Sequence, residues 1–199
     1  MARPLLLPLV ALVLLALAPE AALAHSGHAA GGFSIGFMHP LGGLDHVLAM
    51  VAVGLFAWHL GGKALWLVPA AFVATMAVGG AIGMAGTGLP LVEVGIALSI
   101  VVIGGLVALR RTMPTALAMT LVAVFALFHG QAHGAEMSQA ASGLAYGLGF
   151  LMATALLHGA GILTGATIGQ LGTQRGIAVA RASGAAIATA GILILSGTI

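Results

Sequence analysis

The feature that most restricts how this chain can fold is a series of apolar runs, each about twenty residues long. Only 5% of the 199 residues are charged and 61% are hydrophobic, whereas a soluble domain usually has about 25% charged residues. A water-soluble fold could not cover its surface with so few charges. Helices of about twenty apolar residues match the thickness of a lipid bilayer. The sequence therefore predicts an all-α integral membrane protein.

Composition also excludes several classes of function. The six basic residues form no stripe that could follow a nucleic-acid backbone, so we expect no nucleic-acid partner. The chain has no cysteine, which excludes disulfides, thiolate metal sites and iron–sulfur clusters. A bound metal would need nitrogen and oxygen ligands, with methionine sulfur as a weaker option. We interpret the nine scattered methionines as core packing.

Residues 1–24 resemble a secretory signal peptide. Arg3 is followed by an apolar core over residues 5–17 and by the small-x-small sequence Ala22-Leu23-Ala24. The alternative is a retained first membrane helix, but the core is short and Pro8 interrupts it. Cleavage would leave one mature domain, residues 25–199, with His25 at its start.

The mature chain divides into six predicted transmembrane helices. Residues 25–38 are rich in small residues, and this segment is too polar and too short to span a bilayer. Pro40 and the Gly42-Gly43 pair argue against an unbroken helix between His39 and His46. The predicted spans are residues 42–60, 64–84, 91–109, 114–133, 140–168 and 177–199.

The basic residues predict the orientation of these helices. All basic residues of the mature chain fall on one side of the predicted bundle, and the loops at 86–90 and 134–139 have none. By the positive-inside rule, the mature N-terminus then lies outside the membrane. The basic residues on the inner side are Lys63, Arg110, Arg111, Arg175 and Arg181.

Two polar motifs interrupt the apolar sequence, and both lie at its outer side. In the second motif, His129, His133 and Glu136 are spaced i, i+4, i+7 and fall within about 60° of one helix face. This spacing would direct two imidazoles and a carboxylate toward one cation. Ionisable groups inside a membrane are costly and usually functional.

The first motif places His39, Asp45 and His46 within eight residues. Asp45 could bind a metal directly or hold an imidazole in place. Of the remaining histidines, His158 lies deeper in the fifth predicted helix, whereas we interpret His59 as an interhelix hydrogen-bond donor. Imidazole and carboxylate without thiolate could hold Ni²⁺ or Co²⁺, or Zn²⁺, and still release it.

The two motifs together resemble those of the HupE/UreJ family. The matching sequences are His39-Pro40-x-x-Gly43-x-Asp45-His46 and Phe128-His129-Gly130-x-Ala132-His133-Gly134-x-Glu136. These small bacterial membrane proteins are encoded with hydrogenase or urease genes and are regarded as nickel, in some cases cobalt, permeases. The resemblance implies that the metal is handled by His39, Asp45, His46, His129, His133 and Glu136. His25 and His28 resemble the family's processed N-terminus and would capture metal before entry.

We therefore expect a non-enzymatic inner-membrane permease that imports Ni²⁺, alone or as a homo-oligomer, with its mature N-terminus in the periplasm. The ion would pass His158 on its way inward. The first and fourth predicted helices would be equivalent in two inverted three-helix halves. One alternative is an integral-membrane zinc hydrolase built on His46, His129, His133 and Asp45. Another is a b-type haem protein with paired axial histidines.

Overall fold

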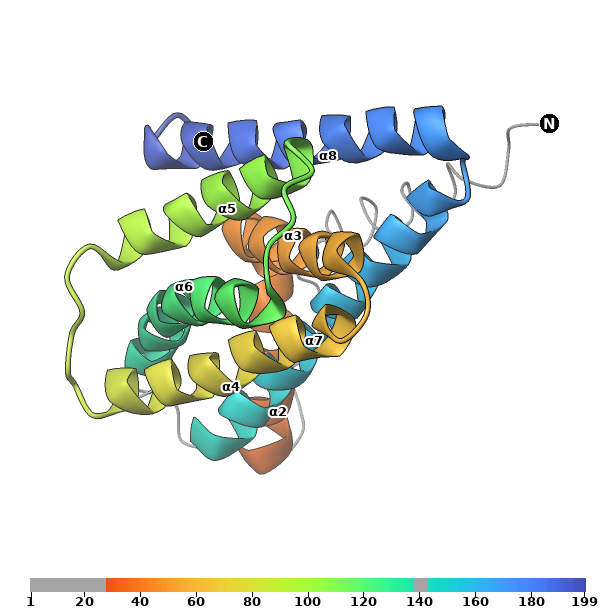
Figure 1. Ribbon diagram of the computed structural model, residues 1–199. Coiled ribbons are helices and arrows are strands. Elements are labelled where there is room, and N and C mark those ends of the chain that lie inside the picture. Colours follow the sequence, from red (N-terminus) through yellow and green to blue (C-terminus); the bar gives the residue numbers. More distant parts are fainter. Residues whose placement is uncertain (1–27, 138–142) are drawn as a thin grey trace.

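The computed structural model describes residues 28–137 and 143–199, with side chains described from residue 32 to 135 and from 143 onward. The predicted signal peptide and His25 lie outside these residues. The described chain is all α-helical, as predicted, and contains no strand (Figure 1). Its helices are α2 (His28–Gly42), α3 (Leu44–Leu60), α4 (Ala64–Met84), α5 (Val92–Ala108), α6 (Thr115–Met137), α7 (Gly143–Gly169) and α8 (Thr173–Leu195).

Four of these helices are long and apolar enough to cross a membrane: α4, α6, α7 and α8. A fifth span results if α2 and α3 count as one, because the two pass the same test together although they are bent by 81°. The apolar helix α5 has 17 residues and is shorter than α4, α6, α7 and α8. Each predicted span thus corresponds to a helix, from α3 to α8, and four to five of them have the dimensions of a transmembrane segment.

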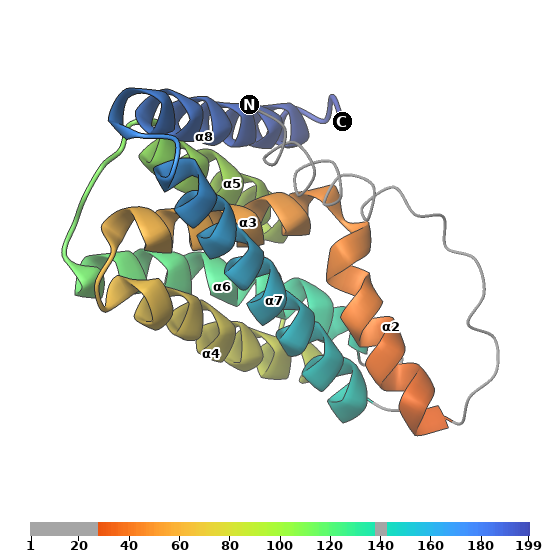
Figure 2. The same ribbon diagram turned by 90° about the vertical axis from the view of Figure 1, so that its right-hand side faces the viewer.

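Helix α2 is the element that the sequence analysis did not predict. Its glycines give it a low intrinsic helix propensity, but it packs along α7 (Figure 2). The contact is close because it involves Gly36 of α2 and Gly149 of α7. A Cβ atom on Gly36 would overlap the carbonyl of Tyr146, and one on Gly149 would overlap the carbonyl of Phe33. Tertiary packing stabilises this helix where local propensity does not.

The predicted interruption of the first motif is confirmed. Gly43, between α2 and α3, has an extended backbone with φ −93° and ψ 119°. Pro40 lies inside the last turn of α2, where it cannot donate a backbone hydrogen bond. The bend places His39 on α2 but Asp45 and His46 on the first turn of α3.

Helix α8 begins four residues earlier than the sequence predicted. We expected a loop over residues 170–176, but α7 ends at Gly169 and α8 starts at Thr173. Gly172 has φ 81°, a conformation that glycine adopts without steric penalty. The chain can therefore reverse within three residues.

Close packing of α4 against α6 positions the second motif. A Cβ atom on Gly130 would overlap the carbonyl of Met76, and one on Gly134 would overlap the carbonyl of Gly80. These two glycines of the motif therefore let the two backbones touch. Their neighbours His129 and His133 extend to His46 of α3.

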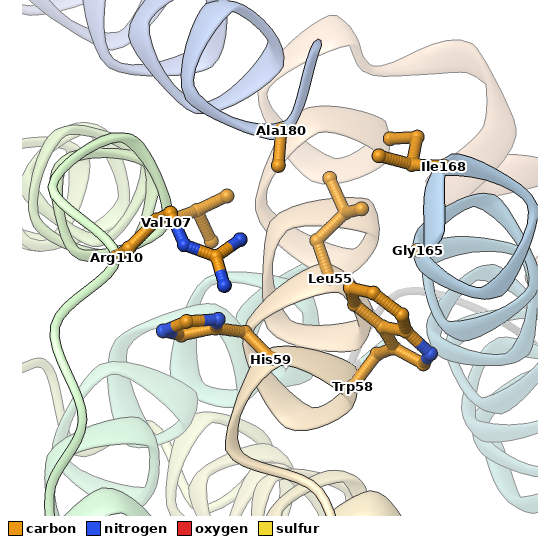
Figure 3. A pocket seen from close by; sticks show the side chains of 8 residues that line it. All are labelled: Leu55, Trp58, His59, Val107, Arg110, Gly165, Ile168 and Ala180. Atoms are coloured by element: carbon orange, nitrogen blue, oxygen red, sulfur yellow. The ribbon is translucent and has the colours of Figure 1, made fainter. Parts of the chain in front are cut away.

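The loops that follow α3, α5 and α7 lie at one end of the bundle, on the left in Figure 2. This end holds a pocket to which four helices and the loop after α5 contribute, with Arg110 directed toward the ring of His59 (Figure 3). The Nε2 atom of His59 is buried and has no partner among the described residues. Because a guanidinium repels cations, this pocket is a poor metal site. It is lined by Leu55, Trp58, His59, Val107, Arg110, Gly165, Ile168 and Ala180.

Candidate metal site

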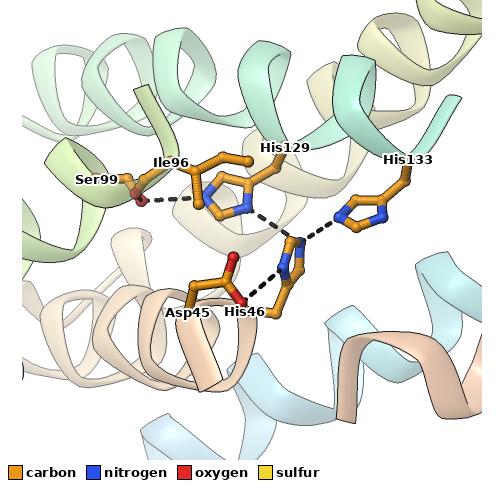
Figure 4. Close-up of polar contacts among 6 residues, drawn as sticks. All are labelled: Asp45, His46, Ile96, Ser99, His129 and His133. Carbon is orange, nitrogen blue, oxygen red and sulfur yellow. Dashed lines mark hydrogen bonds and ion pairs between the residues drawn. The ribbon is translucent and has the colours of Figure 1, made fainter. Parts of the chain in front are cut away.

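The two sequence motifs meet in the interior of the bundle. His46 of α3 lies between His129 and His133 of α6 (Figure 4). Its Nε2 atom is 3.1 Å from His129 Nδ1 and 2.8 Å from His133 Nε2. The three residues are 3%, 0% and 7% exposed, in the order His46, His129, His133. Residues more than eighty positions apart in sequence thus form one buried group of imidazoles.

Ser99 of α5 determines which ring nitrogen of His129 carries the proton. The Ser99 hydroxyl donates its one hydrogen to the carbonyl of Ile96, at 2.6 Å. It therefore accepts from His129 Nε2, which is 3.0 Å away. In a neutral ring this leaves a lone pair on Nδ1, the atom that faces His46. Ser99 thus directs a metal-binding lone pair of His129 into the cluster.

Asp45 also influences which ring nitrogen of His46 carries the proton. Its Oδ1 atom lies 3.6 Å from His46 Nδ1, on the side of the ring away from the other imidazoles. The carboxylate favours a proton on Nδ1, which leaves a lone pair on Nε2. In the neutral cluster His46 Nε2 and His129 Nδ1 then face each other with two lone pairs. Such an arrangement is stabilised by a cation between them, either a proton or a metal ion.

Aromatic side chains surround the outer part of the cluster. Phe150 of α7 contacts His46 and His133, with ring centroids 5.7 and 4.4 Å away. His39 of α2 packs edge-on against His133, with a centroid distance of 4.9 Å, and against Tyr146, at 5.8 Å. His39 is exposed, and the Asp45 side chain is 31% exposed. These two residues form the accessible rim of the buried cluster.

The structure unites only part of the predicted site. His39, Asp45, His46, His129 and His133 lie together, but no three acidic or histidine side chains in the described ranges are arranged to hold one ion as they stand. The backbone of Glu136 continues α6 and that of His28 begins α2, and neither side chain is described. His25 lies outside the described residues.

His158 lies next to the cluster but not in it. It is 1% exposed, and its ring packs edge-on against Phe72 of α4, with a centroid distance of 5.1 Å. Phe72 also contacts His129, at 5.6 Å. One aromatic ring therefore borders both the cluster and the deeper histidine.

The sequence analysis missed Ser99 and Phe150. Ser99 is the only hydroxyl residue in α5, an otherwise apolar helix except for Glu93 in its first turn. A lone serine of this kind could have been recognised as a hydrogen-bond partner for a buried group. Phe150 has no such signature, because one apolar residue among many on α7 does not reveal which neighbours it meets.

Comparison with known proteins identifies the family of the chain. A model of the family described as HupE / UreJ protein matches residues 12–194. Protein HupE of Rhizobium leguminosarum bv. viciae is 47% identical over 180 residues, which cover 90% of this chain and 92% of that protein. No solved structure matches the chain significantly. Since the family model spans nearly the whole chain and the relative matches over almost its full length, this chain belongs to the HupE/UreJ family.

Proposed function

We propose that this protein is a permease that imports Ni²⁺ across the bacterial inner membrane for the maturation of a nickel enzyme, a hydrogenase or a urease. The family associates the chain with metal uptake, and Co²⁺ and Zn²⁺ are the competing ions. The observation that supports the proposal most directly is the cluster of three buried imidazoles contributed by α3 and α6.

Exposure changes gradually through the proposed metal path. His39 is exposed and Asp45 is partly exposed, whereas His46, His129 and His158 are all at most 3% exposed. An ion could first meet a rim with a carboxylate and then exchange its water for imidazole nitrogens. Glu136 would add a second carboxylate, and His25 and His28 would collect the ion before it enters.

The distribution of basic residues supports placing the cluster at the periplasmic side of the membrane, where an imported ion enters. The cluster lies toward the end of the bundle where α2 joins α3, away from the loops at Lys63, Arg110 and Arg111. We propose that these loops face the cytoplasm and that the mature N-terminus, after removal of residues 1–24, faces the periplasm. Helices α3 to α8 would then be six membrane spans. The short helix α5 would require local thinning of the bilayer.

Uptake of radiolabelled Ni²⁺ tests the proposal. Cells expressing the wild type should accumulate nickel, and His46→Ala and His133→Ala should reduce the rate to that of empty cells at equal expression. His59→Ala is the matched control, because this histidine lies at the opposite end of α3 and outside the cluster. Excess Co²⁺ and Zn²⁺ would rank the competing ions.

Wild-type uptake no greater than that of empty cells would contradict the permease and favour a zinc hydrolase. Equal loss in all three variants would instead contradict the assignment of the metal path to the cluster, since the cluster histidines would then behave no differently from His59.

A further inference from the structure

His158 is a buried polar side chain that lies outside the three-histidine cluster. It lies in the middle of α7 and is 1% exposed. Neither ring nitrogen has a hydrogen-bond partner in the part of the chain that the structure describes. Buried polar groups are normally paired, because an unpaired one loses its hydration without compensation. An unpaired buried histidine is expected where the side chain binds a ligand that is present only part of the time.

A second buried polar contact lies one helical turn away. Thr154 precedes His158 by four residues on α7 and is therefore on the same face. Its hydroxyl lies 4.0 Å from the sulfur of Met76, and the two residues are 0% and 2% exposed. Met76 in turn follows Phe72 by four residues on α4. Helices α4 and α7 thus meet at two successive levels, Phe72 against His158 and Met76 against Thr154.

The three polar groups are suited to a soft or borderline cation. Imidazole nitrogen and thioether sulfur favour nickel, cobalt or copper over magnesium and calcium, and the hydroxyl adds a neutral oxygen. Resting on the proposed transport function, we propose that His158, Met76 and Thr154 form a second metal site, which lies beside the His46–His129–His133 cluster and extends inward from it to His158. Phe72 borders both sites.

The composition of this inner site fits a transient role. It contains no carboxylate, so no negative side chain neutralises the charge of a bound divalent ion. The ion is therefore held less tightly than at the outer cluster beside Asp45. Weak sites in series allow an ion to enter and also to leave. The inner site would thus accept the ion from His129 and pass it toward the cytoplasmic end.

Nickel K-edge X-ray absorption on the purified full-length protein tests the inner site. The chain has no cysteine, so in thiol-free buffer a sulfur ligand to Ni²⁺ must come from methionine. We expect a sulfur contribution at saturating Ni²⁺ that disappears in Met76→Leu. Met119→Leu is the control and should retain the signal, because Met119 lies ten residues before His129 on α6. Met76→Leu nearly conserves volume, so folding should be maintained.

Metal stoichiometry provides a second measurement. Isothermal titration with NiCl₂ should show a weak event that His158→Gln removes while the affinity of the tighter event changes less than about twofold. Absence of sulfur from the wild-type spectrum, or its persistence in Met76→Leu, would overturn the inner site even if uptake is intact. A wild type that neither binds nor imports nickel would overturn the proposed function as well.

Discussion

Ser99 Oγ accepts a hydrogen bond from His129 Nε2 at 3.0 Å, because the hydroxyl donates its own proton to the carbonyl of Ile96. The hydroxyl therefore holds His129 in the tautomer whose Nδ1 lone pair faces His46. Ser99 is a positioning residue: it shapes the cluster without occupying its centre.

Replacing Ser99 by alanine should weaken metal binding by about 10- to 100-fold, the usual effect of removing a group that orients a ligating histidine. The variant leaves the Nε2 proton of His129 without its acceptor, so the ring can change its tautomer. Titration of the purified protein with NiCl₂ measures the effect. Ser99→Thr retains the hydroxyl and should bind within a few-fold of the wild type. Equal affinities for Ser99→Ala and the wild type would show that Ser99 is only a packing residue.

Asp45→Asn should raise the KM for nickel uptake about tenfold or more, because it removes the negative charge near His46 Nδ1 while keeping the size of the side chain. The carboxylate also attracts the ion at the exposed rim, and salt screens this attraction. The wild-type KM should therefore rise with ionic strength more steeply than that of Asp45→Asn. Glu93→Gln measures how much an exposed carboxylate outside the cluster contributes at the same end of the bundle, since Glu93 lies in the first turn of α5. The same salt dependence in wild type and Asp45→Asn would contradict an electrostatic role for Asp45.

Most of the fold follows from hydrophobic runs and their breaks. Each predicted span matches a helix because glycine and charged residues mark the ends, as Gly61 does with φ 70°. Helix α2 could not be predicted, since its stability depends on contact with α7 and not on local propensity. The start of α8 was misplaced because a single glycine suffices for the turn there.

The site was predictable to the extent that its residues are rare in an apolar chain. Histidine and aspartate stand out by their type, so both motifs could be recognised, and His46 of the first motif faces His129 of the second. The contributions of Ser99 and Met76 depend on which helices pack together. One sequence does not give that information, and methionine in particular was interpreted as core packing.

Gly134→Ala should destabilise the protein by about 1–3 kcal/mol or more, because the new methyl group overlaps the α4 backbone at Gly80 and the helices must separate. Thermal unfolding in detergent would show a lower Tm. Gly105→Ala on α5 is the control: no atom lies within 4 Å of its added Cβ. In a helix interior this change should be neutral or stabilising by up to about 1 kcal/mol. An unchanged Tm in Gly134→Ala would contradict the close contact between α4 and α6.

Nickel uptake should decline as the external pH falls below about 6.5, near the ordinary pKa of imidazole. The sign follows from the ligand form: only neutral imidazole offers a lone pair to a metal, so protons and Ni²⁺ compete for the same nitrogens. The apparent KM should therefore rise as the pH decreases, while saturating nickel partly restores the rate. Initial uptake rates between about pH 5 and 8, measured at several nickel concentrations, separate this competition from a loss of folded protein, which excess nickel would not reverse. His59→Ala should follow the wild-type profile because His59 lies outside the cluster. Uptake that is constant down to about pH 5 would contradict competition between protons and Ni²⁺ for the histidines in this pH range.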